Sequence, residues 1–71
     1  MSSGAYIRVN GEDEQLAAAT VAALLKERSI DGGERGIAVA VNGSVVPRAA
    51  WAQTPLRAGD QVEIVRARQG G

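Results

Sequence analysis

The sequence of 71 residues contains no cysteine, no histidine and no phenylalanine. Without cysteine there is no disulfide framework, and without both cysteine and histidine the usual ligands of a zinc site are missing. The lack of histidine also removes the commonest general acid–base group. Since no pair of acidic residues clusters in a recognisable cleft either, we expect no catalytic residue and no metal site, and we predict that the chain is not an enzyme.

The chain also lacks a surplus of charge and a long apolar run. Its 8 basic and 8 acidic residues give a formal net charge of zero, whereas a nucleic-acid-binding protein carries a strong basic surplus. No segment approaches the ~20 apolar residues of a membrane helix. Met1–Gly4 shows neither the basic nor the apolar part of a signal peptide. We therefore expect a cytoplasmic protein with no nucleic-acid or membrane partner.

The length of the chain predicts one small domain. A chain of this size buries about 60% of its unfolded surface and can fold without a disulfide or a metal. We assign residues 1–71 to a single domain in which residues 67–71 form a flexible C-terminal tail.

The first third of the chain predicts a strand, a turn and acidic residues. Ala5–Asn10 alternates between apolar and polar residues, as a half-buried strand does. Asn10-Gly11 is the strongest short hairpin signal, because both central positions of a type I′ turn have positive φ. We place the acidic residues 12–14 at this turn, as a solvated tip and not a metal site, and a weak second strand at Gln15–Ala17.

A helix is predicted to follow. Thr20 can cap it, and the apolar residues Val21, Leu24 and Leu25 form one stripe of an amphipathic helix. The glycine-rich segment 31–36 is expected to stop the helix and to form a mobile loop. It lacks the pattern of a phosphate-binding loop, and its glycines follow a helix instead of preceding one.

The second half predicts three more strands. Ile37–Val41 is apolar on both faces, as a central strand is, and Asn42-Gly43 predicts a second hairpin that returns through Val45 and Val46. Pro47 cannot donate a ladder hydrogen bond, so the returning strand ends there or lies at an edge. Residues 49–53 predict a short helical turn that brings Trp51 into the core, where packing is a better explanation than a ligand platform.

The last predicted strand is Gln61–Arg66, after a turn at residues 58–60. Val62 and Ile64 point inward in this pattern, and Glu63 and Val65 point outward. One helix must cover one face of a mixed sheet of four to five strands, which is an α+β plan with two layers. If the first and last strands lie side by side and parallel, the fold is a β-grasp.

The chain ends with two glycines, Gly70 and Gly71, after Gln69. Glycine has no Cβ, so this tail can thread a narrow channel in almost any backbone conformation. No side chain crowds the terminal carbonyl carbon, which leaves the carboxylate open to activation by another protein. A frayed glycine-rich end is the alternative interpretation.

Several motifs of the second half together resemble the ThiS family, the sulfur carriers of thiamine biosynthesis, which have a ubiquitin-like β-grasp. The resemblance covers roughly residues 37–71, and the first half agrees in the order of its elements only. The matching motifs are Val41-Asn42-Gly43, Val45-Val46-Pro47-Arg48, Trp51, Leu56, Gly59-Asp60, Val62-Glu63-Ile64-Val65 and Gly70-Gly71. The MoaD type of molybdopterin synthesis and the ubiquitin-related modifier type share the di-glycine end, but a proline-rich approach to the tail, expected of MoaD, is missing here.

The resemblance implies a carrier whose own C-terminus is modified. A ThiF-type adenylating enzyme would use ATP and Mg²⁺ to convert the Gly71 carboxylate into an acyl-adenylate. A sulfur-transfer protein would then leave a thiocarboxylate on Gly71, which would donate sulfur to a ThiG-type thiazole synthase. No cofactor would be bound by the chain itself. Gly71 is thus the expected modified residue, and Gly70 is the slender neck beside it.

Docking of partners is expected near the tail and on the outward face of the sheet. The candidates beside the tail are Gln69, Arg68 and Arg66, and those on the face are Val65, Tyr6, Ala38 and Ala40. Three other functions remain open from the sequence: a carrier for another sulfur pathway, a ubiquitin-like modifier that forms amides with target lysines, and a plain binding domain with an idle tail.

Overall fold

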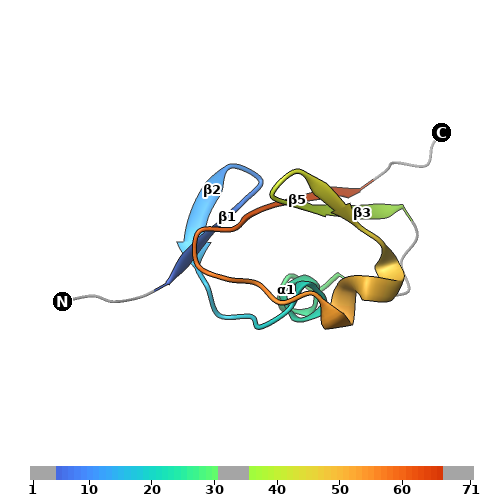
Figure 1. The fold of residues 1–71 in the computed structure, drawn as a ribbon, viewed down its shortest axis with the longest axis horizontal. Helices are drawn as coiled ribbons and strands as arrows, with labels where there is room; N and C mark the ends of the chain where they lie inside the picture. The colour runs from blue at the N-terminus through green and yellow to red at the C-terminus, as the bar shows by residue number, and fades with distance from the viewer. Residues whose placement is uncertain (1–4, 31–35, 67–71) are drawn as a thin grey trace.

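The structure, a computed structural model, describes residues 5–30 and 36–66. The strands form one five-stranded mixed sheet in the order β2-β1-β5-β3-β4, in which only the β1–β5 pair is parallel (Figure 1). This confirms the predicted α+β β-grasp, with the first and last strands side by side. The elements are β1 (Tyr6–Val9), β2 (Glu12–Gln15), α1 (Val21–Glu27), β3 (Ile37–Val41), β4 (Ser44–Val46), the 3₁₀ helix η1 (Arg48–Gln53) and β5 (Gln61–Arg66).

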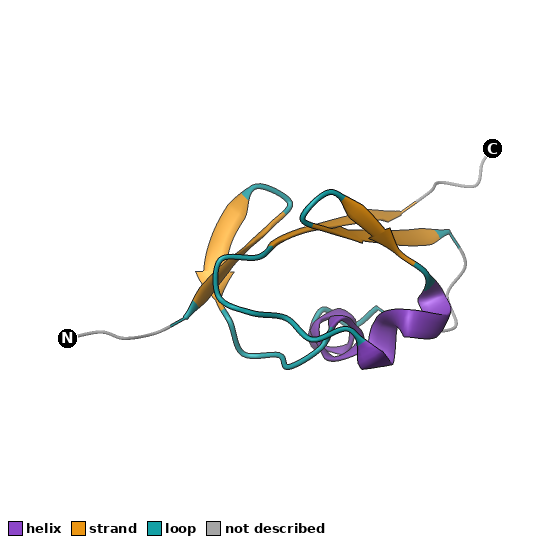
Figure 2. Ribbon diagram, in the orientation of Figure 1, coloured by secondary structure: helices purple, strands orange, loops and turns teal. Residues whose placement is uncertain are grey.

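Two layers enclose the core. The helices α1 and η1 lie on the same face of the sheet, and the loops 16–20 and 54–60 join them to the strands at one end of the layer (Figure 2). The core is aliphatic apart from Trp51, and its members at 2% exposure or less are Ile7, Val21, Leu24, Leu25, Val39 and Val62. No helix of the described residues covers the opposite face of the sheet, where Tyr6, Arg8, Ala38, Glu63 and Val65 are exposed. Neither helix of the described residues has the length and apolar character needed to cross a membrane.

Both asparagine–glycine pairs form the predicted hairpins. Asn10 and Gly11 have φ of 51° and 86°, and Asn42 and Gly43 have φ of 52° and 86°. These are the positive values that a type I′ turn requires at both central positions. As predicted from Pro47, β4 ends at Val46 and lies at the edge of the sheet.

The position predicted for the second strand is wrong. The expected strand at Gln15–Ala17 lies instead at Glu12–Gln15, so the acidic residues form the strand and not the turn. The two-residue turn fixes this register, because it pairs Val9 directly with Glu12. A charged edge strand needs no apolar alternation, and its charges hinder pairing with other chains.

Helix α1 begins at the predicted cap, but what ends it is not the glycine-rich segment. Thr20 Oγ1 accepts a hydrogen bond of 3.2 Å from the Ala23 N–H, which caps the first turn. At the other end Ser29 adopts φ 62°, and the N–H groups of Ser29 and Ile30 donate to the carbonyl oxygens of Lys26 and Leu25. This is a Schellman motif, so the helix stops before the glycine-rich segment that was expected to stop it. Residues 31–35 of that segment lie outside the described residues.

The second half matches its predicted elements. Trp51 is 5% exposed within η1 and packs in the core, and the Arg48 guanidinium lies 5.0 Å from the centre of its ring. Strand β3 lies inside the sheet, but the central strand is β5. Ala38 is exposed and Val39 is buried, so Ala38 lies on the outward face, where it was expected as a docking candidate.

Candidate docking surface

Strand β5 connects the core to the C-terminal tail. It pairs with β1 on one side and with β3 on the other, and its last residue, Arg66, pairs with Ile37. The chain continues from Arg66 into residues 67–71, so the predicted site residues Arg68, Gln69, Gly70 and Gly71 lie outside the described residues. The described part of the site is therefore the surface around the end of β5.

Apolar side chains gather on the outward face of the sheet beside this end. Val65 is opposite Ala38 on β3, and Ala40 is opposite Val45 on β4. Val65 and Val45 are 58% and 75% exposed, although both are large aliphatic residues. We call the group formed by Ala38, Ala40, Val45 and Val65 the outer-face patch. A contiguous exposed apolar group makes this face the candidate surface for docking of another protein.

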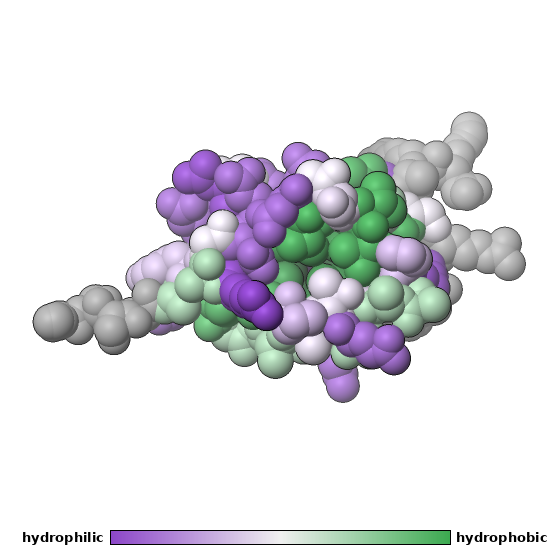
Figure 3. All heavy atoms as spheres, in the orientation of Figure 1, coloured by the Kyte–Doolittle hydropathy of each residue, from purple (hydrophilic) through white to green (hydrophobic). Residues whose placement is uncertain are grey.

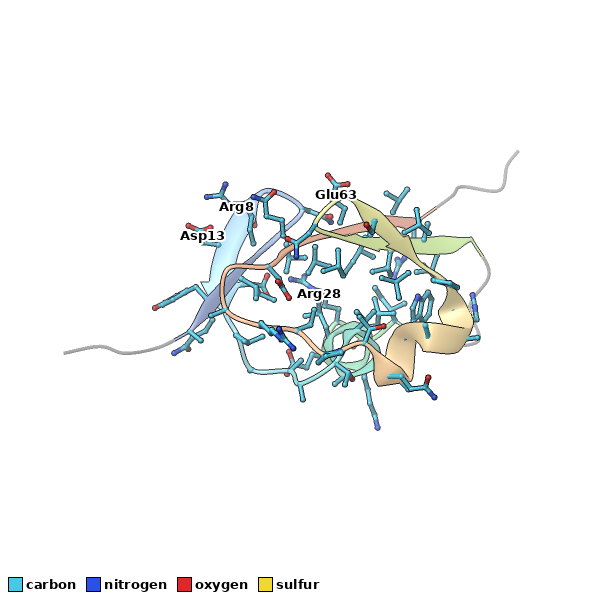
Figure 4. The ribbon with its side chains drawn as sticks, in the orientation of Figure 1. Arg8, Asp13, Arg28 and Glu63 are labelled. Carbon is cyan, nitrogen blue, oxygen red and sulfur yellow. The ribbon has the colours of Figure 1, made fainter. Side chains whose placement is uncertain are left out.

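The patch occupies only one half of the sheet. Apolar side chains gather over β3 and β4 in Figure 3, whereas polar ones cover the β1–β2 hairpin. In that hairpin Arg8 Nε lies 3.0 Å from Asp13 Oδ1, on paired positions of the outward face. Figure 4 shows this pair and Glu63 on the outward side of the sheet and Arg28 on the opposite side. Glu63, opposite Ala40, gives the patch an acidic margin.

The structure separates Tyr6 from Val65. Tyr6 is level with Gly59, whose N–H donates a hydrogen bond of 2.8 Å to the Tyr6 carbonyl oxygen. Arg8 pairs with Gln61 at the beginning of β5, Tyr6 precedes Arg8 by two residues on the parallel strand β1, and Val65 follows Gln61 by four. Tyr6 and Val65 are therefore about 20 Å apart along the sheet, at roughly 3.3 Å per residue. Tyr6 lines a separate hollow of about 300 Å³ with Arg8, Asp13 and Gln61 among its neighbours. Val65 is thus brought together with Ala38 and Ala40, but not with Tyr6.

Arg66 and Val65 lie on opposite faces of β5. By strand alternation Arg66 shares the side of Val62 and Ile64, which face α1. It lines a hollow of about 310 Å³ with Asn10, Arg28, Ile30 and Ile64. Arg66 therefore presents a cation to the side of the sheet that faces α1, and Val65 presents an aliphatic group to the outward side.

Sequence reasoning missed Val45 and Glu63 as parts of this surface. The signal for Val45 was present, because a two-residue turn at Asn42-Gly43 pairs Val41 with Ser44 and Ala40 with Val45. Val45 must then share the outward face with Ala40. Glu63 was predicted to point outward, but its position beside Ala40 depends on the pairing of β5 with β3.

Two acidic residues of β2, Asp13 and Glu14, are each paired with an arginine. Asp13 pairs with Arg8 on the outward face, and Glu14 pairs with Arg28 on the face that carries α1. Because neighbouring strand residues point to opposite faces, these carboxylates diverge. Among residues 5–30 and 36–66, no group of three or more His, Cys, Asp or Glu side chains could hold a metal ion.

Comparisons with known proteins give a consistent result. The family model described as "ThiS family" matches residues 6–71. A thiazole synthase from Paramagnetospirillum magneticum is 41% identical over 64 residues, a match that covers 89% of this chain but only 19% of that protein. The crystal structure of the thiamine biosynthesis protein ThiS from Geobacter metallireducens matches with a TM-score of 0.75 and 29% identity, covering 93% of this chain and 99% of that one.

Proposed function

This chain belongs to the ThiS family of ubiquitin-like sulfur carriers, and from that premise we propose that it carries sulfur for thiazole formation in thiamine biosynthesis. The observation that carries the proposal is the extent of the family match, which runs through Gly71 and so includes the di-glycine tail as well as the β-grasp core. The ThiS protein of Geobacter metallireducens supports it, because the two chains cover one another almost completely.

The proposed cycle takes place on the Gly71 carboxylate. A ThiF-type enzyme binds ATP and Mg²⁺, and a carboxylate oxygen of Gly71 attacks the α-phosphorus of ATP, which releases pyrophosphate and forms an acyl-adenylate. The persulfide of a sulfur-transfer protein attacks the acyl carbon and releases AMP. The product is an acyl disulfide, in which the S–S bond of the persulfide is still intact. A thiol then attacks the donor's sulfur of this S–S bond, which leaves a thiocarboxylate on Gly71 and a disulfide on the donor side.

Each step has a chemical reason. A carboxylate is a poor electrophile until one of its oxygens is part of a good leaving group, and adenylation supplies that group. A thiocarboxylate keeps the sulfur covalently bound while leaving it nucleophilic towards a thiazole synthase. In this scheme the carrier contributes the reacting carbon and a docking surface, and its partners contribute the catalytic groups, in the cytoplasm.

We assign the docking of the ThiF-type enzyme to the outer-face patch. Val65 lies directly before Arg66, so a partner that covers the patch meets the chain where it leaves the sheet. Arg66, Arg68 and Gln69 then serve as polar contacts along the tail. The slender neck at Gly70 lets the terminal carboxylate enter the active site of that enzyme.

A ThiG-type thiazole synthase is the proposed acceptor of the sulfur. Its support is the Paramagnetospirillum magneticum protein, which is named a thiazole synthase and of which this chain matches a part. In that protein a carrier-like part and a longer remainder belong to one chain. This is what we expect if a carrier and a thiazole synthase act in the same reaction sequence.

Intact-protein mass spectrometry tests the proposal. The chain is incubated with ATP, Mg²⁺, a sulfur donor and a ThiF-type enzyme, and a mass increase equal to replacing one oxygen by sulfur is expected at Gly71. A variant with one alanine added after Gly71 is the control and should stay unmodified. If the native chain stays unmodified beside an active partner, the carrier proposal is wrong, and adducts of higher mass would instead indicate a protein modifier.

A further inference from the structure

The backbone pairing between β1 and β5 ends before β5 does. Its last paired residues are Val9 and Val62, and the Asn10 N–H still donates a hydrogen bond of 2.9 Å to the Val62 carbonyl oxygen. The chain then turns away at Asn10-Gly11. Ile64 lies two positions beyond Val62, so its N–H and carbonyl oxygen point to the same side as those of Val62, where β1 offers no further backbone.

The side chain of Asn10 takes the place of the missing backbone. Its Oδ1 accepts a hydrogen bond of 2.8 Å from the Ile64 N–H, and its Nδ2 donates one of 3.3 Å to the Ile64 carbonyl oxygen. One amide group thus satisfies both backbone groups of Ile64, as another residue of β1 would. On the other side β3 pairs with β5 as far as Arg66. Asn10 therefore completes the support of β5 shortly before the tail begins.

We infer that Asn10 is a positioning residue for the C-terminal tail. The inference rests on the proposed function, since it concerns how the tail reaches an adenylating partner. A strand end that is already fixed loses little conformational freedom when the carrier docks, and this lowers the free-energy cost of binding. A strand end held from one side only must be ordered during docking, which raises the KM for the carrier.

Asn42 offers a matched control within the same protein. It has nearly the same φ, 52° against 51° for Asn10, and it occupies the same position of an Asn-Gly hairpin. It also makes two side-chain hydrogen bonds near β5, in which Oδ1 accepts from the Gln61 N–H at 2.9 Å and Nδ2 donates to Asp60 Oδ1 at 3.0 Å. These bonds lie at the beginning of β5, at the end of the strand opposite to the tail.

The experiment compares Asn10→Gly with Asn42→Gly. Glycine adopts the positive φ of both positions, so each variant keeps its turn and loses only the side-chain bonds. Pyrophosphate release by a ThiF-type enzyme is measured against carrier concentration at a temperature where both variants are folded. We expect the KM of Asn10→Gly to rise about fivefold with kcat unchanged, because the net contribution of one hydrogen bond corresponds to a factor of about five. The KM of Asn42→Gly should stay near the native value.

A second measurement separates positioning from general stability. Amide hydrogen exchange in the free carrier should become faster at Ile64 in Asn10→Gly and at Gln61 in Asn42→Gly. Asn10→Asp, which keeps the turn and the acceptor for the Ile64 N–H but loses the donor, should give a KM between those of the native chain and Asn10→Gly. This variant also carries the test if Asn10→Gly does not fold.

The outcomes are distinct. A raised KM in the Asn10 variants alone supports the inference. A native KM in both Asn10 variants overturns it, and so does an equal rise in Asn42→Gly, because a general loosening of the sheet then explains the effect. If the native chain itself is not adenylated by an active partner, it is the proposed function that fails.

Discussion

The indole Nε1 of Trp51 donates a hydrogen bond of 2.9 Å to the backbone carbonyl oxygen of Val46. Val46 is the last residue of β4, and Pro47 separates it from the 3₁₀ helix that contains Trp51. The bond thus ties the edge strand to the helical layer, while the ring itself fills the core. The Trp51 side chain thus joins the two layers at the corner of the sheet where Val45 is exposed.

Replacing Trp51 with phenylalanine should destabilise the fold by about 2 kcal/mol, from the lost hydrogen bond and the smaller ring. Because the variant loses the only tryptophan, tryptophan fluorescence cannot follow its unfolding. Urea unfolding is therefore followed by far-UV circular dichroism. Trp51→Ala should cost more, about 3–5 kcal/mol. A native midpoint for Trp51→Phe would show that the indole N–H contributes nothing to stability.

The helix cap gives a second stability prediction. Thr20→Ala removes the acceptor for the Ala23 N–H and should lower the free energy of unfolding by about 1 kcal/mol. Thr20→Ser keeps a hydroxyl at the same position and should stay close to the native value. Thermal or urea unfolding of the three proteins checks this, and equal stability of Thr20→Ala and Thr20→Ser would refute the capping role.

Much of the fold could be predicted because strong local signals coincide with its turns. Each Asn-Gly pair favours positive φ at two residues, as a type I′ turn requires, and this turn sets the hairpin and its register. Thr20, Pro47 and Trp51 each mark a boundary or a core position by their own chemistry. The position of β2 could not be found from apolar periodicity, since an exposed edge strand of charged residues has none. Its register follows from the preceding turn.

The candidate site was harder to predict than the fold. Alternation along one strand shows whether a side chain points outward, and it correctly placed Tyr6 and Val65 on the outward face. It does not show how far along the sheet two outward residues lie from one another. That distance depends on the parallel pairing of β1 with β5, which joins residues more than 50 positions apart.

The outer-face patch predicts a position-dependent effect of charge. Val65→Asp should keep the fold, because Val65 is 58% exposed, and should reduce kcat/KM for adenylation about tenfold. Tyr6→Asp adds the same charge to the same face at the distant end of the sheet and should have a smaller effect. Rates of pyrophosphate release at several carrier concentrations measure both variants. Full activity of a folded Val65→Asp variant would count against the patch as the docking surface.

The last prediction concerns the neck of the tail. In Gly70→Val a β-branched side chain restricts the backbone and widens the chain next to the reacting carboxylate. The substitution lies beyond β5, so we expect unchanged circular dichroism and unfolding. Adenylation should fall about 100-fold, since a misplacement of about 1 Å at a reacting group has an effect of that size.

Gly70→Ala provides the graded control for this prediction. A single Cβ widens the neck without branching, so its activity should lie between those of the native chain and Gly70→Val. Mass spectrometry of the thiocarboxylate product and pyrophosphate release should give the same order of activity. If Gly70→Val reacts at the native rate, the partner's channel does not require a slender neck. The glycines of the tail would then serve its conformational freedom and not its width.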